Sequence, residues 1–276
     1  MHRKIIEKKL LSMIEEDGFM DITSDIVPER EVDAVIIAKE PAAVSGISEL
    51  KILFDLFNIK VVDSLNDGDE FNTNDIVLKI RGNSRDILLI ERTALNMLSR
   101  MSGITTLTKQ YVRKINEINP NVKIAATRKT NPLLGYFEKK AVRIGGGDTH
   151  RFNLGDCVLI KDTHLALFSD VSDAVATAKA NTSFTHKIEI EVSTIEDAKK
   201  SVAADIIMFD NMNPDDIRSA VYELRNNLNF RGALEASGGI NSNNLQEYAK
   251  TGVDVISIGA LTNAAKSIDI SLRILG

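Results

Sequence analysis

Residues 206–240 read IIMFDNMNPDDIRSAVYELRNNLNFRGALEASGGI, and this stretch decides the fold class. Its two short apolar runs, 206–209 and 233–236, have the composition of buried strands. The segment between them, 214–226, is amphipathic and predicts a helix. Strand, helix and strand in this order predict one βα unit of a parallel sheet.

The same alternation continues on both sides of this unit. Amphipathic segments such as 194–203 and 243–251 separate further short apolar runs. These runs are 122–126, 157–160, 188–190 and 255–258. Six strands from this part of the chain predict an open or irregular α/β barrel, or a doubly wound sheet.

Each predicted strand is followed at once by polar residues or glycine. In chain order these are Thr127-Arg128-Lys129, Lys161, Glu191, Asp210, Ser237-Gly238-Gly239 and Gly259. The C-terminal ends of parallel strands converge on one face, where barrel enzymes build their active sites. The sequence therefore predicts an active site at this face.

The first third of the chain has a different pattern. Residues 33–39 and 75–80 have the apolar content of strands, and 88–102 predict a helix. Ser102-Gly103 is expected to break that helix at a domain junction. We therefore predict an N-terminal domain of residues 1–102 and a catalytic domain of residues 103–276, whose last helix packs on the first domain.

Composition excludes several classes of protein. The 276 residues are 43% hydrophobic with a net charge of −5, which favours a globular protein and gives no reason to expect nucleic-acid binding. The single cysteine, Cys157, permits no internal disulfide and fits a reducing compartment. The basic start of the chain lacks the apolar core of a signal peptide, and no apolar run approaches membrane-spanning length. We expect a soluble cytoplasmic protein without membrane contact.

Basic residues concentrate between positions 128 and 161, where seven Lys and Arg and one His face three acids. Lys139, Lys140 and Arg143 are expected on a solvated helix face. The others follow predicted strands or the glycines 145–147, and Arg offers bidentate geometry to carboxylate and phosphate. Arg128, Lys129, His150, Arg151 and Lys161 therefore predict a substrate with several negative charges.

Two carboxylates, Glu191 and Asp210, follow neighbouring predicted strands and are of the type that holds Mg²⁺ beside a polyphosphate, directly or through water. Glu189 is expected to be a surface acid or a salt-bridge partner of a lysine. The glycine-containing turns after the last two strands are of the kind that binds phosphate. Lys161 also permits a Schiff-base enzyme, but the surplus of arginine favours anion binding.

The chain resembles the quinolinate phosphoribosyltransferases, also called carboxylating nicotinate-nucleotide pyrophosphorylases, over nearly its whole length. The motifs that carry the resemblance, in order, are DIT (21–23), ERTALNMLSRMSGI (91–104), ATRKTNP (126–132), KKAVRIGGGDTHR (139–151), LIKDTH (159–164), EIEV (189–192), MFDNM (208–212), EASGGI (235–240) and ISIGALT (256–262). The resemblance implies an N-terminal α/β sandwich domain and a C-terminal irregular α/β barrel, the type II phosphoribosyltransferase architecture. It also implies a homodimer or higher homo-oligomer with shared active sites.

The resemblance also implies a reaction in NAD biosynthesis and a role for each residue. The reaction transfers the phosphoribosyl group of 5-phosphoribosyl-1-pyrophosphate (PRPP) to quinolinate, giving nicotinate mononucleotide, carbon dioxide and pyrophosphate with Mg²⁺ as cofactor. Lys129, Lys161, Glu191 and Asp210 would be catalytic, with Glu191 and Asp210 on ribose and Mg²⁺, and Arg92 would come from the neighbouring subunit. The remaining substrate contacts would be Thr127, Arg128, His150, Arg151, Ser237, Gly238, Gly239, Ile258, Gly259 and Ala260.

Some positions depart from the family's usual residues. Asn263 stands where many members carry His, which puts in doubt an imidazole near the phosphates. Two alternatives stay open: a transferase of the same fold acting on another base, such as nicotinate or the substrate of the molybdenum-utilisation ModD proteins, and a non-catalytic phosphate-binding module. Lys161 within IKD argues against the ModD group, and the Glu191 and Asp210 pair argues against the silent module.

Overall fold

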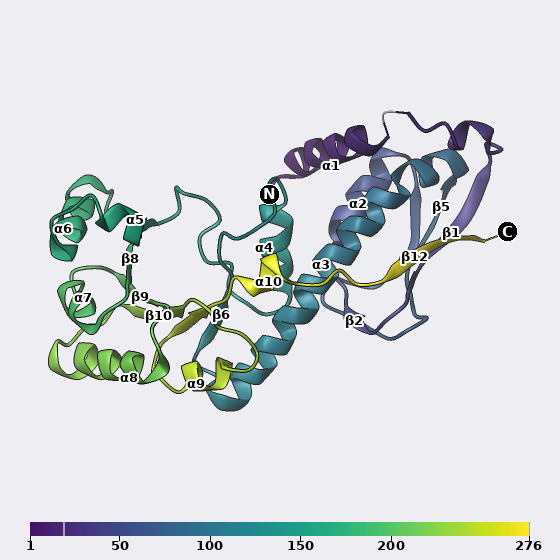
Figure 1. Ribbon diagram of the computed structural model, residues 1–276. Helices are drawn as coiled ribbons and strands as arrows, with labels where there is room; N and C mark the ends of the chain where they lie inside the picture. The colour runs from purple at the N-terminus through teal and green to yellow at the C-terminus, as the bar shows by residue number, and fades with distance from the viewer. Residues whose placement is uncertain (19, 276) are drawn as a thin grey trace. The chain divides into compact units, whose positions relative to one another are not determined.

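The computed structural model describes residues 1–18 and 20–275, which form two compact units (Figure 1). The first unit contains residues 1–107, 136–145 and 265–276, and the second contains 108–135 and 146–264. Both units are therefore built from discontinuous stretches of chain, and short segments far from the N-terminus complete the first unit.

The first unit has a four-stranded antiparallel sheet in the order β12-β1-β5-β3. The strands are β1 (Glu31–Ala38), β3 (Lys60–Ser64), β5 (Ile76–Asn83) and β12 (Ile270–Leu275). Buried residues alternate along β5, as a sheet with one covered face requires. The helices of this unit are α1 (Arg3–Asp17), α2 (Ile47–Leu56), most of α4 (Gly135–Ile144) and the first part of α3 (Ser84–Ile118), beside a short 3₁₀ turn (Ser24–Ile26) and the paired β2 (Ala42–Ala43) and β4 (Glu70–Phe71).

Two expectations for this unit are wrong. The helix does not end at Ser102-Gly103, because α3 continues to Ile118. A Cβ on Gly103 would lie 1.9 Å from the carbonyl oxygen of Lys266, so this glycine permits a close backbone approach. The last segment is also not a helix: Ile270–Leu275 is a strand paired antiparallel with β1.

Helix α4 carries two lysines whose side chains are buried or ion-paired inside the first unit. Lys139 is 1% exposed and Lys140 lies 2.7 Å from Glu49, so the expected solvated face is wrong for both lysines. The Lys140 side chain points inward, where Glu49 and Asp67 lie within ion-pairing distance of its ammonium group. Arg143 is exposed, as the sequence predicts.

The second unit has a six-stranded parallel sheet in the order β6-β11-β10-β9-β8-β7, which confirms the predicted open barrel-like architecture. The strands β6 and β7 form its two edges. The strand bounds are β6 (Lys123–Ala125), β7 (Val158–Ile160), β8 (Ile188–Val192), β9 (Ile206–Asp210), β10 (Ala233–Ser237) and β11 (Val255–Ser257). Every strand therefore falls within, or within two residues of, an apolar run predicted from the sequence.

Helices connect these strands and cover one side of the sheet. Figure 1 shows α6, α7 and α8 side by side along the strands. Thr194 caps α7 by accepting the N–H of Asp197, and Asn213 caps α8 in the same way with Asp216, with Pro214 beginning the helix. The helices of this unit are α5 (Asp162–Leu165), α6 (Val171–Asn181), α7 (Ile195–Lys200), α8 (Pro214–Tyr222) with a π turn (Glu223–Asn227), α9 (Leu245–Ala249) and α10 (Ala260–Asn263).

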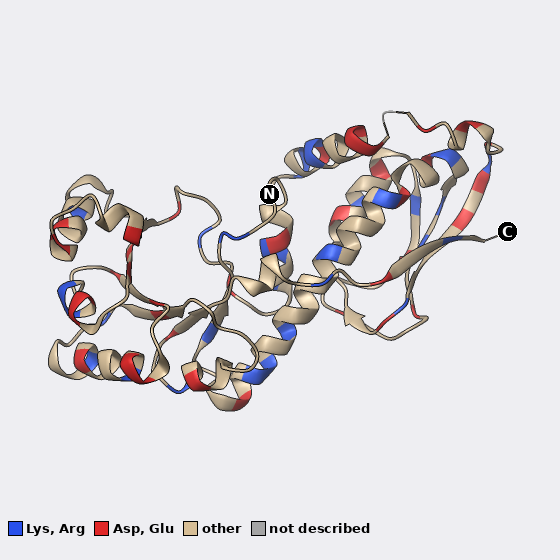
Figure 2. Ribbon diagram, in the orientation of Figure 1, with Lys and Arg blue, Asp and Glu red and all other residues tan. Residues whose placement is uncertain are grey.

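The two faces of the parallel strands differ in chemistry. Ile190, Phe209 and Ala236 are fully buried and belong to one face. Residues of the opposite parity are polar near each strand's C-terminal end, as Glu191, Asp210 and Ser237 show. The outer helices α7 and α8 carry both acids and bases (Figure 2). The sheet therefore directs a separate set of polar groups toward its interior.

Candidate active site

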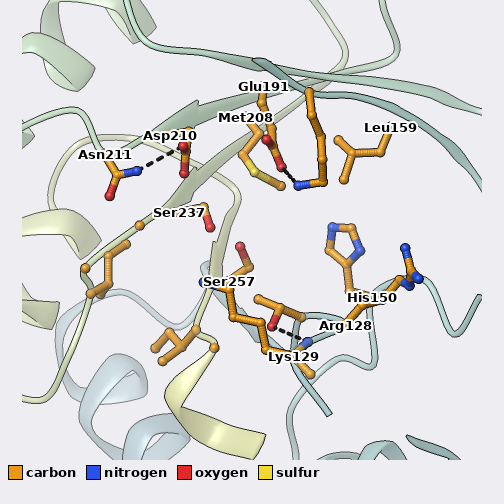
Figure 3. A pocket seen from close by; sticks show the side chains of 18 of the residues that line it. Arg128, Lys129, His150, Leu159, Glu191, Met208, Asp210, Asn211, Ser237 and Ser257 are labelled. Atoms are coloured by element: carbon orange, nitrogen blue, oxygen red, sulfur yellow. Dashed lines mark hydrogen bonds and ion pairs between the residues drawn. The ribbon is translucent and has the colours of Figure 1, made fainter. Parts of the chain in front are cut away.

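A cavity of about 710 Å³ lies at the C-terminal ends of the parallel strands. Every strand of this sheet, or the turn that follows it, contributes lining residues. Figure 3 shows labelled side chains from separate strands around one open space. The cavity thus lies at the face that the sequence predicts.

The predicted site residues of the second unit all line this cavity. They are Thr127, Arg128, Lys129, His150, Arg151, Lys161, Glu191, Asp210, Ser237, Gly238, Gly239, Ile258, Gly259 and Ala260. Arg92 is the exception, since it is an exposed residue of α3 in the first unit. Its predicted place in a neighbouring subunit's site stays a prediction.

Lys161, the residue directly after β7, forms an ion pair with Glu191 of the neighbouring strand β8. The Lys161 side chain is 40% exposed and that of Glu191 is 13% exposed, so the pair lies at the boundary between cavity and interior. An ammonium group in this place can also reach an anion in the cavity. The pair therefore places a partly exposed positive charge beside an acid.

Asp210 ends β9 and lies in a turn that is held to the next strand. Asn211 donates its side-chain N–H to Asp210 over 2.9 Å, and its backbone N–H to the Ser237 carbonyl over 2.9 Å. Gly238 follows with a φ of +89°, where a Cβ would lie 2.3 Å from the Asn211 side-chain oxygen. Glycine is therefore required at 238 for both backbone conformation and space.

The loop after β6 is fixed from the far end of the unit. The hydroxyl of Thr262 in α10 donates to the Lys129 carbonyl over 2.8 Å, and the Lys129 N–H donates to the Thr127 hydroxyl over 3.2 Å. Arg128 and Lys129 themselves are exposed. The loop thus has a fixed backbone and two cationic side chains at the mouth of the cavity.

His150 lies between two buried acids beneath the cavity. Its Nε2 is 3.4 Å from Glu189 and 3.3 Å from Glu235, whose side chains are 0% and 3% exposed. Burial alone would lower the pKa of His150, but the two carboxylates outweigh it and raise the pKa to about 10. Burial also raises the pKa of Glu189, against the effect of His150.

The other ring nitrogen of His150, Nδ1, makes a hydrogen bond that opposes its protonation. Nδ1 accepts the backbone N–H of Arg151 over 2.8 Å, which in a neutral ring leaves the proton on Nε2. A second proton on Nδ1 displaces this hydrogen bond. Two buried carboxylates outweigh one neutral donor, so we assign His150 a raised pKa.

Glu189 and Glu235, which contact His150 from below the cavity, were not predicted as site residues from the sequence. Glu189 is a fully buried partner of His150, so its expected place at the surface or beside a lysine is wrong. A period of two along each strand gives the signal, because Glu189 shares a face with Glu191, and Glu235 shares one with Ser237. These acids form the layer below the predicted residues.

Cys157 is half-buried near this layer, and burial raises its pKa to about 11. A thiol with a raised pKa is a poor nucleophile, which agrees with its expected role as a small hydrophobic residue.

No helix in the described part of the chain is long and apolar enough to cross a membrane.

Known proteins of one family resemble this chain over both units. The profile for the quinolinate phosphoribosyl transferase N-terminal domain matches residues 21–102, and that for the C-terminal domain matches residues 104–273. A probable carboxylating nicotinate-nucleotide pyrophosphorylase of Methanocaldococcus jannaschii is 48% identical over 99% of this chain and 96% of its own length. The rat carboxylating nicotinate-nucleotide pyrophosphorylase is 32% identical over 95% of this chain and 89% of its own.

A solved structure extends the likeness to three dimensions. The nicotinate-nucleotide pyrophosphorylase from Francisella tularensis is 33% identical and superposes with a TM-score of 0.91, covering 100% of this chain and 98% of its own. Matching profiles, identity and fold all span both units. The chain belongs to the quinolinate phosphoribosyl transferase family.

Proposed function

We propose that this chain transfers the phosphoribosyl group of PRPP to quinolinate and releases carbon dioxide and pyrophosphate, forming nicotinate mononucleotide for NAD biosynthesis. The observation that carries the proposal is the shared cavity, in which Arg128, Lys129, Arg151 and Lys161 accompany two carboxylates. Quinolinate has two carboxylates and PRPP has phosphate groups at both ends. A site for both must neutralise several negative charges at once.

The base would occupy the part of the cavity near His150 and Arg151. Arg128, Arg151 and Lys161 supply charge for its carboxylates, and guanidinium groups match carboxylates in bidentate geometry. Arg92 of a second subunit would complete this part in a homodimer. Its exposed position on α3 is compatible with that role.

The donor would occupy the glycine-containing ends of β10 and β11. Backbone groups of Ser237, Gly238 and Gly239, with those of Ile258–Ala260, would surround its 5-phosphate. A Cβ at Gly259 would lie 3.0 Å from the Lys129 side chain, so this lysine lies close to the proposed phosphate site. Thr127 and Lys129 would then contact the phosphoribosyl group.

Glu191 and Asp210 have the donor chemistry that Mg²⁺ requires. Both line the cavity with oxygen ligands, and Mg²⁺ commonly uses one or two carboxylates together with substrate phosphates and water. Bound there, the ion would neutralise charge on the pyrophosphate. Lys161 already balances one of the two acids, so Asp210 has the larger share of uncompensated charge.

The chemistry assigns these residues mainly to orientation and charge balance. The pyridine nitrogen of quinolinate attacks the anomeric carbon as the bond to pyrophosphate breaks. Lys129 and Lys161 balance the negative charge on the leaving group, and Glu191 and Asp210 hold the ribose hydroxyls. When the bond from C2 to the carboxylate breaks and carbon dioxide departs, its electron pair stays on C2, where the adjacent pyridinium nitrogen stabilises it electrostatically, and this pair then takes up a proton from solvent.

An assay with two bases tests the proposal. The purified chain is incubated with PRPP, Mg²⁺ and either quinolinate or nicotinate, and pyrophosphate and carbon dioxide are measured. We expect equal amounts of both products with quinolinate and neither with nicotinate. Pyrophosphate from nicotinate alone would indicate a transferase for another base, and neither product despite ligand binding would indicate a silent module.

A further inference from the structure

Two buried glutamates, Glu189 and Glu235, lie below the cavity, at positions in the strands where an apolar side chain would pack without loss of solvation. Glu189 and Glu235 are buried, and two of their carboxylate oxygens accept no hydrogen bond of normal geometry from the described residues: the Glu189 oxygen that faces His150, and the Glu235 oxygen that does not. A buried polar atom without a hydrogen bond costs free energy, so its presence calls for an explanation. Their common contact is Nε2 of His150.

His150 stands at a strained point of the backbone. Its φ is +50°, in the left-handed region that non-glycine residues rarely adopt. The Asp148 side chain accepts the His150 N–H over 2.8 Å, which supports this turn from the backbone side. The ring contacts with the two acids hold it from the side-chain end.

Arg151 depends on this turn for its direction. It follows His150 immediately and lines the cavity, with one guanidinium nitrogen 3.4 Å from the Cys157 carbonyl oxygen. The segment that contains both residues joins the two edge strands of the sheet: Asp148 pairs with Ala125 at the end of β6, and Cys157 precedes β7. Anchoring the His150 ring therefore fixes the part of this connection that carries Arg151.

We propose that Glu189 and Glu235 are positioning residues that hold the His150 ring from below and, through it, the turn that directs Arg151 toward the base. This inference rests on the proposed function, because it assigns the base to the Arg151 part of the cavity. The two acids come from β8 and β10, which are not neighbours in the sheet. Contacts from two separate strands restrict the ring more than contacts from one.

A proton suits this cluster better than a metal ion. The three potential ligand atoms lie within 4.8 Å of one another, but a divalent cation would add charge next to Arg151 in a cavity that already contains several cations. The hydrogen on Nε2, which is present in both the neutral and the protonated ring, faces the same two acids, and the ring adds at most one positive charge where the ion would add two. The acids therefore act on His150 itself.

Isosteric variants test this role. Glu189→Gln and Glu235→Gln keep the side-chain volume but remove the charge, and each should raise KM for quinolinate about tenfold, with KM for PRPP changed less than about twofold. Glu49→Gln is the matched control, since it alters a buried, ion-paired acid of the first unit. An unchanged KM for quinolinate in both active-site variants would overturn the proposal.

A double-mutant cycle separates positioning from general stability. If Glu235 acts through His150, Glu235→Gln should have no further effect on KM for quinolinate in a His150→Gln background. Additive effects would contradict action through the ring. Should Glu235→Gln fail to fold, the cycle with Glu189→Gln decides by the same criterion.

Nitrogen NMR of the His150 ring and the Arg151 amide gives a readout that does not need catalysis. The signals of both should shift in the Glu189→Gln and Glu235→Gln variants and stay in place in Glu49→Gln. Inactive wild-type protein with these shifts would reject the proposed function and retain the anchoring. Active protein without these shifts would reject the anchoring alone.

Discussion

The ammonium group of Lys161, directly after β7, pairs with the carboxylate of Glu191 in β8, in the lining of a cavity to which all six parallel strands or their following turns contribute. This pair joins the two kinds of charge that the proposed reaction needs. In the proposed reaction the cation would serve phosphate and carboxylate, and the acid would serve ribose and Mg²⁺.

Replacing Lys161 with alanine should lower kcat/KM at least about tenfold, because a charge-assisted contact contributes roughly 1.5–3 kcal/mol. Steady-state kinetics with quinolinate and PRPP measure this effect. Lys179→Ala is the matched control, since Lys179 is exposed in α6 and does not line the cavity. Equal kinetics for the two variants would exclude Lys161 from the site.

Replacing Asp210 with asparagine should raise the Mg²⁺ concentration needed for half-maximal activity. The change removes a negative charge that Lys161 does not balance, while the neighbouring Asn211 contact can persist. A magnesium titration of activity measures the shift. If the titration curve does not move, Asp210 has no part in holding the ion.

Two adjacent glycines provide a test of the proposed phosphate site. Gly238→Ala should raise KM for PRPP far more than Gly239→Ala, because a Cβ at 238 meets Asn211 at 2.3 Å while one at 239 meets nothing within 4 Å. Both positions have positive φ, and the strain at 238, where φ is +89°, adds to the steric clash, whereas the φ of +62° at 239 lies within the left-handed region. Equal effects on KM would remove the steric argument.

Arg92 predicts complementation between subunits. Arg92→Ala and Lys161→Ala should each be nearly inactive alone, but mixed subunits should regain about a quarter of wild-type activity, since half of the dimers are mixed and each has one intact site. Activity after mixing and refolding the two variants measures this. Absence of any recovery would contradict a site shared between subunits.

The pKa of His150 predicts how stability changes with pH. The folded value of about 10 exceeds the ordinary 6.5, so the protonated ring stabilises the fold fully below pH 6.5. This stabilisation is lost as pH rises toward 10, by about 1.4 kcal/mol for each pKa unit. Denaturant unfolding between pH 6 and 10 should show a steeper loss for wild type than for His150→Gln; parallel curves would contradict the raised pKa.

The strands and the residues that follow them could be predicted because short apolar runs and polar strand ends are local signals. Arg128, Lys161 and Asp210 were found in this way and line one cavity. Whether an acidic side chain is buried cannot be predicted from the residues next to it in the sequence. Glu189 appears as polar as Glu191 in sequence, and only the neighbouring strands and His150 make it buried.

Other errors come from contacts between distant segments. Glycine is common at the end of a helix, but Gly103 lies inside α3. It is glycine there because the Lys266 backbone passes too close to leave room for a Cβ atom. A lysine is expected at the surface, but Lys139 is buried and Lys140 forms an ion pair with Glu49, which lies far from it in the sequence. The C-terminal strand likewise depends on its pairing with β1, more than two hundred residues earlier.

A crystal structure with bound quinolinate tests the central claim most directly. We expect the base in the cavity of the parallel sheet, with its carboxylates within hydrogen-bonding distance of Arg128, Arg151 or Lys161. Quinolinate bound away from all three cations, or found only outside this cavity, would contradict the account.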